Sequence, residues 1–329
     1  MPFVLLFLLT LLLTLVLTVT ATRLILPVLK RYHLGQRILE IGPAWHRTKA
    51  GTPTMGGLAF VAASLLGLLV AGGLLARDLP ALFWRPLLLS FLYALSNAII
   101  GAIDDGAKLR KKENEGLTPP QKLLLQIATA CAYIALLRYY GHIDTTLYIP
   151  FLDTVWELGF LYDVIAVLLA VGMVNFVNLS DGVDGLASSL VCVLSAFFIV
   201  AATLLHESTG VLMATAAMGA CLGFLVFNRH PARIFMGDTG SLFLGGMCVG
   251  CGFLIENPLI LLVAGGAFVL EGISVILQVA WYKISGKRLF LMAPFHHHLE
   301  KRGLSENAIV LRFVLLGIAL GALALLGIG

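Results

Sequence analysis

The sequence predicts an all-α polytopic membrane protein with about ten transmembrane helices, built as one domain over residues 1–329. Its composition is 59% hydrophobic and only 12% charged, and its mean hydropathy is +0.97. A water-soluble domain carries roughly 25% charged residues, so this chain has too few to cover a water-facing surface. Long apolar runs follow one another without a polar linker. Lipid is therefore the expected solvent for most of the chain.

The apolar runs give the helices in order, because a spanning helix needs about 20 mostly apolar residues. The first run lacks a basic start and is longer than the apolar core of a signal peptide, so we predict a spanning helix there. The expected spans are 2–22, 55–76, 86–104, 121–140, 160–178, 186–206, 210–227, 240–256, 259–282 and 306–327. Between the fourth and fifth, the segment 141–159 alternates apolar and polar residues around Pro150. This alternation predicts a small hairpin or an interfacial segment.

Lysines and arginines divide the loops into two classes. Most of the 22 follow the first, third, seventh and ninth helices, whereas the opposite loops hold only Arg77, Arg85 and Arg138. Cytoplasmic loops carry the excess of basic residues. We therefore expect the basic loops in the cytoplasm, and the hairpin and both termini outside it. Since orientation accounts for the basic charge, the net charge of +4 indicates no nucleic-acid partner.

The expected cytoplasmic helix ends carry clusters of ionisable residues, which are costly at membrane depth and usually line a cavity or site. Asp104 and Asp105 close the third helix, and Lys108 follows one turn later. Adjacent carboxylates repel one another unless a cation lies with them. Mg²⁺ and the lysine would meet that need, although a solvated helix end explains this motif alone equally well.

A second cluster lies between the fifth and sixth helices, where Asn178, Asp181 and Asp184 stand in a loop without a basic residue. Asp181 and Asp184 are three residues apart, so both face one side if the turn is helical. A polar turn with a capping aspartate is the simpler interpretation, but it explains only one of the acids. At the start of the eighth helix, Asp238 suits Mg²⁺ as a hard oxygen ligand. It could cap that helix as well.

Two further segments complete the polar face. His296, His297 and His298 are consecutive, and adjacent residues do not share one helix face, which argues against zinc. Beside a phosphate cluster, imidazoles can donate hydrogen bonds or transfer protons. The loop around Lys49 and Thr54 is rich in glycine, threonine and positive charge, which fits a phosphate-holding turn, but it lacks the order of a Walker A loop.

Carboxylates mixed with cations on one membrane face predict phosphate chemistry with a divalent metal. An ion carrier would more naturally place its charges near the bilayer midplane. Glu271 and Gln278 in the ninth expected helix are the only candidates for that position, and a buried Glu is as often a hydrogen-bonding residue in the packing between helices.

The order of the motifs GTPTMGG, AIDDGAK, NFVNLSDGVDGLA, FNRHPARIFMGDTGSL and MAPFHHHLEKRG over about residues 45–305 resembles bacterial phospho-N-acetylmuramoyl-pentapeptide transferases. The Asp-rich motifs are shared with the wider superfamily of polyprenyl-phosphate N-acetylhexosamine-1-phosphate transferases. PTMGG and APFHHHLE are the narrower signature.

The resemblance implies a bacterial cytoplasmic-membrane enzyme with its active site on the cytoplasmic face. It would transfer phospho-MurNAc-pentapeptide from UDP-MurNAc-pentapeptide to undecaprenyl phosphate, giving lipid I and UMP. The resemblance also implies Mg²⁺ as the cofactor and a homodimeric enzyme. Asp104 and Asp105 match the family's catalytic pair, Asp238 its magnesium ligand and His296 an essential histidine. Positions that match the substrate pocket or further polar site positions are Lys49, Thr54, Lys108, Asn178, Asp181, Asp184, Asn228, Phe235, Gln278, His297 and, as a neighbour in the histidine run, His298.

Several alternatives stay open at this point. A sister transferase would use UDP-GlcNAc as donor, and a secondary transporter would move a solute without releasing UMP. Attack by the lipid phosphate could be direct or proceed through an aspartyl-phosphate. The motifs do not decide whether Asp104 or Asp105 accepts the proton.

Overall fold

The computed structural model describes residues 3–31, 49, 51–75, 81–111 and 116–328. It contains nine long apolar helices that could cross a membrane by length and composition. Four of the basic residues used for orientation, Arg37, Arg47, Arg77 and Lys112, lie outside the described residues. The protein is an all-α polytopic membrane protein, as the sequence predicts.

The elements follow the apolar runs in order. The helices before the hairpin are α1 (Phe3–Arg31), α2 (Gly57–Leu75), α3 (Ala81–Lys111) and α4 (Pro119–Tyr139). The hairpin strands are β1 (Thr146–Ile149) and β2 (Thr154–Glu157). The later helices are α5 (Phe160–Leu179), α6 (Leu186–Leu204), α7 (Ser208–Asn228), α8 (Gly237–Leu254), α9 (Ile260–Ala264), α10 (Gly266–Ser285), α11 (Phe295–Lys301) and α12 (Glu306–Leu325).

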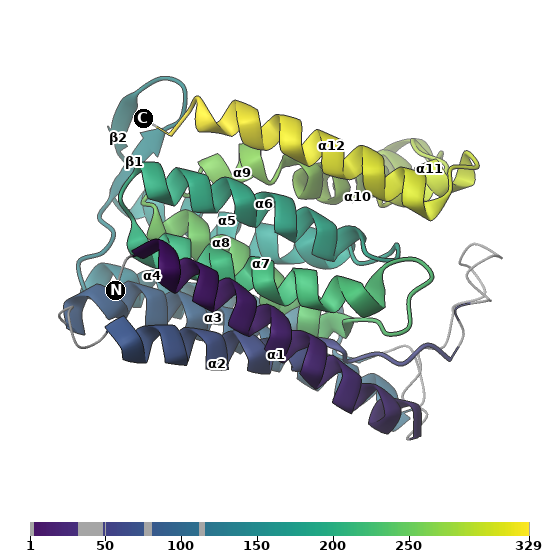
Figure 1. Ribbon diagram of the computed structural model, residues 1–329. Coiled ribbons are helices and arrows are strands. Elements are labelled where there is room, and N and C mark those ends of the chain that lie inside the picture. The colour runs from purple at the N-terminus through teal and green to yellow at the C-terminus, as the bar shows by residue number, and fades with distance from the viewer. Residues whose placement is uncertain (1–2, 32–48, 50, 76–80, 112–115, 329) are drawn as a thin grey trace.

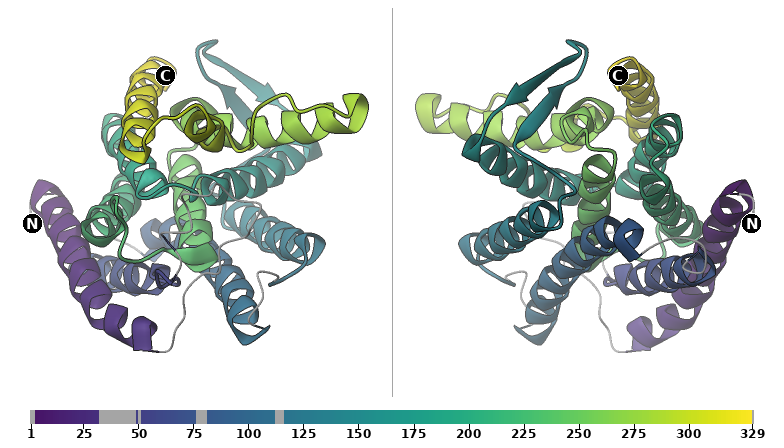
Figure 2. Two further views of the ribbon diagram at one scale, coloured as in Figure 1. Left: turned by 90° about the vertical axis from the view of Figure 1, so that its right-hand side faces the viewer. Right: turned by 90° about the vertical axis from the view of Figure 1, so that its left-hand side faces the viewer.

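Helix α8 is the centre of the bundle. Every residue from Thr239 to Leu254 is buried, and views along the helices show α8 surrounded by the others (Figure 2). Glycines let its neighbours come close: a Cβ at position 245 would lie 2.7 Å from the Cα of Val174 on α5, and one at position 246 would lie 2.6 Å from that of Ala94 on α3. Small residues at such contacts are typical of helix packing in lipid. The middle of α8 is thereby packed closely against α3 and α5.

Two boundaries differ from the sequence expectation. The third helix does not close at Asp104 but continues to Lys111, so the acidic pair and Lys108 lie on one continuous helix. The expected span at 259–282 is broken at Gly265 into α9 and α10, where a Cβ would lie 2.6 Å from the carbonyl oxygen of Leu261. After this break α10 runs outward from the bundle at a steep angle to the other long helices (Figure 2).

The hairpin predicted at 141–159 is confirmed. Strands β1 and β2 pair antiparallel, with Thr146 opposite Glu157 and Ile149 opposite Thr154. Both chain ends lie at the same end of the bundle as this hairpin, whereas α11 lies at the opposite end (Figure 1). The termini and the hairpin therefore lie at one end of the bundle and the histidine segment at the other, as expected.

Candidate active site

Asp105 joins α3 to the first turn of α8. One carboxylate oxygen accepts a hydrogen bond from the backbone N–H of Asp238 at 3.1 Å, and the other accepts from the backbone N–H and the hydroxyl of Thr239 at 2.9 and 2.7 Å. The first N–H groups of a helix have no partner within it, so Asp105 caps α8 from another helix. Gly237, with φ of +70°, brings the backbone within reach: a Cβ there would lie 2.6 Å from the Asp105 carboxylate.

Asp238 lies between cations and an amide. Its Oδ2 is 2.9 Å from Nζ of both Lys108 and Lys122, and its Oδ1 accepts from the Asn178 side chain at 2.9 Å. Three different helices, α3, α4 and α5, thus supply the partners of one carboxylate at the start of α8. Charge-assisted hydrogen bonds of this kind fix a carboxylate more firmly than neutral ones.

Asp104 faces the same point from α3. Its carboxylate lies 2.6 Å from Nζ of Lys108 and accepts from the backbone N–H of Leu117 at 2.7 Å. Carboxylate oxygens of Asp104, Asp105 and Asp238 lie within 4.8 Å of one another. Hard oxygen donors at this spacing fit a divalent cation such as Mg²⁺. Each of the three also has partners in the protein: Asp105 accepts from α8, and Asp104 and Asp238 both pair with Lys108.

The PTMGG segment is attached to the turn that precedes α8. The backbone N–H of Gly56 donates to the carbonyl of Phe235 at 2.9 Å, and that of Phe235 donates to the carbonyl of Pro53 at 2.8 Å. Thr54 is buried between these contacts, and its hydroxyl oxygen lies 3.0 Å from where a Cβ of Gly237 would be. Two motifs far apart in sequence therefore form one wall of the site.

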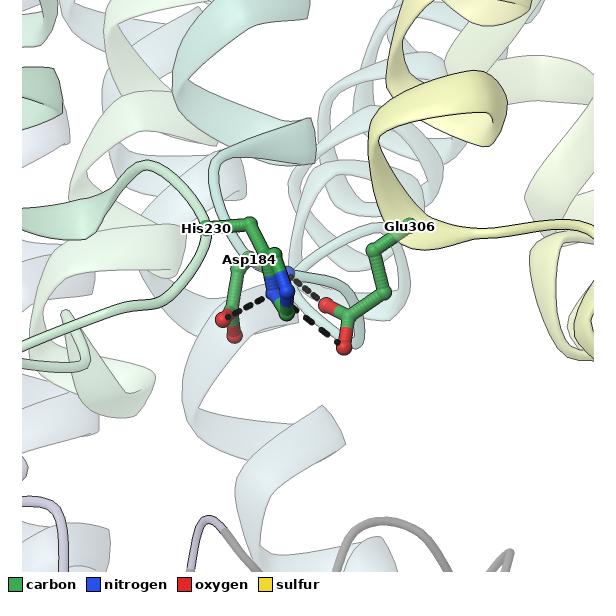
Figure 3. A group of neighbouring side chains, drawn as sticks. All are labelled: Asp184, His230 and Glu306. Atoms are coloured by element: carbon green, nitrogen blue, oxygen red, sulfur yellow. Dashed lines mark hydrogen bonds and ion pairs between the residues drawn. The ribbon is translucent and has the colours of Figure 1, made fainter.

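A second polar cluster surrounds Asp184 at the start of α6. Nζ of Lys49 lies 2.7 Å from both Asp184 Oδ1 and Glu306 Oε2. The other Asp184 oxygen contacts Nδ1 of His230 at 3.1 Å and accepts from the backbone N–H of Ala232 at 2.9 Å. Figure 3 shows that Glu306 approaches this group from the start of α12 and His230 from the loop after α7. The side chain of Asp184 is almost fully buried.

Asp181 connects the two clusters. Burial raises the pKa of its carboxyl well above the ordinary value, and the charges of Asp238, Asp105 and Asp184 raise this pKa further, with Lys49 opposing them. These electrostatic partners come from both clusters. Carboxylates gathered around a partly buried acid favour a cationic ligand or a proton there.

The raised pKa of Asp181 predicts a pH-dependent gain in stability on Asp181→Asn. The folded protein binds this proton more tightly than the unfolded chain, so ionising Asp181 costs folding free energy as pH rises through and above its ordinary value of about 3.9. We expect the variant, without divalent metal in detergent, to melt at a higher temperature than the parent protein at pH 8. The difference should shrink on acidification. Asp153→Asn on the exposed hairpin is the matched control, and an equal trend in that variant would contradict the assignment to Asp181.

The three histidines face different partners. Nδ1 of His296 lies 3.0 Å from the Glu271 carboxylate on α10, and Nδ1 of His297 contacts Glu300 one turn along α11. His298 is turned back to its own loop, where Nδ1 accepts from the backbone N–H of Leu291 at 3.1 Å. His296 lies against the Asp181–Asp184 turn, since a Cβ at Gly182 would overlap with its Nε2.

Three of the residues predicted to contact substrate hold loops in place. The side-chain amide of Gln278 donates to the carbonyl of Phe290 at 3.2 Å and accepts from its N–H at 2.8 Å. Asn228 is buried and donates to the carbonyl of Ile234 at 3.0 Å. The ring of His298 stacks on Phe295 with centroids 5.3 Å apart, and burial lowers its pKa, with Arg302 adding to the shift. These residues shape the site through the segments they fix.

Four residues of these networks did not stand out as site residues in the sequence: Lys122, His230, Glu271 and Glu306. Lys122 and Glu306 each lie in the first turn of a helix, where a charged residue resembles an ordinary solvated helix end. Glu271 had been noted only as a midplane candidate. A signal was present for Glu306, since an acid opening an apolar helix is costly to bury.

Residues 87–255 match the family model described as Glycosyl transferase family 4, and residues 49–61 match signature 1 of phospho-N-acetylmuramoyl-pentapeptide-transferase. A protein of that name from Desulfotalea psychrophila is 43% identical, over 92% of this chain and 87% of its own length. The chain belongs to the phospho-N-acetylmuramoyl-pentapeptide-transferase family. Relatives with the same name from Clostridium acetobutylicum and Bacillus subtilis are 40% and 39% identical, each over 93% of both chains. This chain is therefore a phospho-sugar transferase, and its signature segment at 49–61 contains Lys49, Thr54 and the glycines that follow.

Proposed function

We propose that the chain transfers phospho-MurNAc-pentapeptide from UDP-MurNAc-pentapeptide to undecaprenyl phosphate, which gives lipid I and UMP. The observation that carries this proposal is the convergence of Asp104, Asp105 and Asp238 within 4.8 Å, with Lys108 and Lys122 on Asp238. A diphosphate donor and a phosphate acceptor both need concentrated positive charge, and a metal site beside two lysines supplies it. The match to signature 1 over residues 49–61 favours this donor over UDP-GlcNAc.

The donor set fits Mg²⁺ because it consists of carboxylate oxygens. Asp238 is the proposed ligand, with Asp104 beside it. When bound, the ion would neutralise charge on the diphosphate as UMP leaves. The two lysines balance the charge of Asp238 in the structure, and they lie where they can also contact phosphate oxygens.

The two polar clusters, one around Asp238 and one around Asp184, would bind different parts of the donor. We assign the diphosphate to Lys108 and Lys122 and the nucleoside to the side of Lys49, Asp184 and Phe235. Ion pairs hold the Lys49 side chain between Asp184 and Glu306, so it reaches the site in one orientation. Positioning of this kind converts binding energy into rate, because the reacting atoms meet in the right geometry.

Asp104 is the proposed proton acceptor of the acidic pair. Three hydrogen bonds from the first turn of α8 fix the Asp105 carboxylate in its capping position, whereas Asp104 accepts one backbone N–H and pairs with Lys108. We propose direct attack of a lipid phosphate oxygen on the β-phosphorus of the donor. Rapid quench with donor labelled in the β-phosphate tests this route, and a labelled aspartyl-phosphate on the protein would contradict it.

We place the site at the cytoplasmic face of a bacterial inner membrane, with both termini outside the cytoplasm. The Lys and Arg bias of the loops supports this orientation, and the termini lie at the end of the bundle away from α11 (Figure 1). Cysteine labelling of residues near each terminus in intact cells tests it. Family resemblance further suggests a homodimer, which the mass of the detergent-solubilised protein would establish.

The test of function is UMP release by purified protein with undecaprenyl phosphate, Mg²⁺ and either UDP-MurNAc-pentapeptide or UDP-GlcNAc. We expect release with the first donor, and its abolition by EDTA. Release with UDP-GlcNAc alone would assign the sister activity. Solute flux in proteoliposomes without UMP release would instead indicate a transporter.

Glu306→Gln is expected to raise the KM for the nucleotide-sugar donor about tenfold, since losing one charge-assisted hydrogen bond costs about 1.4 kcal/mol or more. The substitution removes the negative charge that holds Lys49 at 2.7 Å, and the backbone N–H of Asp184 can still donate to the amide oxygen. The KM for undecaprenyl phosphate should not change. Equal increases in both KM values would contradict a role on the nucleoside side.

A further inference from the structure

Glu271 and His296 form a fully buried pair between α10 and α11. Both side chains are 0% exposed. The Glu271 carboxylate faces the ring Nδ1 of His296 at 3.0 Å and the backbone N–H of the same residue at 3.2 and 3.3 Å. Among the described residues, no lysine or arginine forms an ion pair with Glu271. The carboxylate therefore has one residue, His296, as the partner of both its oxygens.

The other nitrogen of this ring faces the site. Nε2 of His296 is buried, and within the described part of the chain it has no hydrogen-bond partner. It lies against Gly182, where a Cβ would overlap with it. Gly182 is part of the turn that carries Asp181 and Asp184. A buried ring nitrogen without a partner is costly, and here it is directed at the turn that connects the two polar clusters.

The chemistry of the pair fixes the ring. A carboxylate oxygen that accepts from the ring requires the proton on Nδ1 of His296, and in the neutral ring Nε2 then keeps its lone pair. Partners that orient a functional histidine in this way set its tautomer as well as its direction. We infer that Glu271 is a positioning residue, which holds His296 so that the Nε2 lone pair accepts a hydrogen bond from an O–H or N–H group of the nucleotide-sugar donor.

This inference rests on the proposed function for the identity of the donor, but the pairing of Glu271 with His296 does not. Glu271 lies on α10, which the break at Gly265 separates from α9. The break directs α10 so that its buried first half, which carries Glu271 and Ser274, meets the histidine segment. Glu271 thus belongs to the site rather than to a path through the membrane.

The kinetic experiment compares Glu271→Gln with Glu271→Asp and with Glu256→Gln, a matched change at the hairpin end. Loss of an orienting partner typically costs 10- to 100-fold. We expect Glu271→Gln to lower kcat/KM for the donor by about that factor and to leave the KM for undecaprenyl phosphate unchanged. Glu271→Asp keeps the charge and should recover part of the loss, and Glu256→Gln should match the parent protein. Donor kcat/KM within twofold of the parent, or equal loss for both substrates, would overturn the inference.

The second measurement needs no catalytic turnover. Protein labelled with ¹⁵N in its histidine rings reports the tautomer of each ring by NMR, and the His296 signal is assigned by its absence in His296→Asn. We expect the proton on Nδ1 in the parent protein and a mixture of tautomers in Glu271→Gln. A proton on Nε2 in the parent protein would overturn the inference. Absence of UMP release by the parent protein would refute the proposed function alone and leave this result standing.

Discussion

Asp238→Asn should lower the rate of UMP release by about a thousandfold, the upper end of the loss seen when one electrostatic group is removed from a transfer site. The Asp238 carboxylate lies 2.9 Å from Nζ of two lysines. Carboxylate oxygens of Asp238, Asp104 and Asp105 lie within 4.8 Å of one another. Asparagine keeps the size but removes the charge. Lys122 then loses the ion pair with Asp238, Lys108 keeps only Asp104, and the proposed Mg²⁺ loses its ligand, so these effects act on the same phosphate groups.

The rate is measured as initial UMP release across a Mg²⁺ titration, on protein whose fold is checked by its melting temperature. We expect the variant to need a higher Mg²⁺ concentration for half-maximal rate and to reach a lower maximal rate of UMP release. Asp153→Asn, an identical change on the exposed hairpin, should leave both quantities unaltered. If Asp238→Asn kept a tenth or more of the parent rate with the same Mg²⁺ dependence, Asp238 would not be the metal ligand.

Asp105→Asn should lower the rate about a hundredfold and also the free energy of unfolding by about 1–3 kcal/mol, the cost of leaving a buried donor unsatisfied. The Asp105 carboxylate accepts three hydrogen bonds from Asp238 and Thr239 at the start of α8. An amide offers one acceptor oxygen and places an N–H₂ group against the remaining donors. The first turn of α8 would shift, and Asp238 would move with it.

Thr239→Val separates the capping role of Asp105 from a direct chemical role. It removes only the hydroxyl donor at 2.7 Å and leaves both carboxylates intact, so the rate should fall severalfold with a smaller loss of stability. Asp104→Asn should lower the rate without a comparable loss of stability, because Asp104 does not contact α8 backbone donors in the described structure. If instead Asp105→Asn kept the parent melting temperature and abolished turnover, Asp105 would be the proton acceptor.

Periodicity and composition were sufficient for the architecture. Nine of the ten expected spans correspond to one helix each, the span at 259–282 corresponds to α9 and α10, and the segment around Pro150 forms the expected hairpin. Helix length in a bilayer is set by the thickness of the hydrocarbon, and this constraint is readable in any apolar run. The break at Gly265 is not readable from the sequence, because a Gly265–Gly266 pair inside an apolar run does not reveal that a Cβ at position 265 would clash with the carbonyl oxygen of Leu261.

The site residues follow a different rule. Asp104, Asp238 and Asp184 were recognisable because charges are costly beside long apolar runs. Their partners were not: Lys122 reaches Asp238 across 116 residues, and Glu306 reaches Lys49 across 257. Nothing local in the sequence distinguishes a lysine that pairs with a distant carboxylate from one that faces water.

The sequence by itself thus determined that the chain is embedded in a membrane, which helices it forms and which acidic residues are candidates for the site. The tertiary structure decided how the acids divide their work: Asp105 caps α8, Asp238 meets the lysines, and Glu271 fixes His296. The physical reason is how much of the chain each effect depends on. Hydrophobic period and the cost of charge in a bilayer are properties of a short segment, whereas a hydrogen bond between two helices depends on how close the whole bundle brings them.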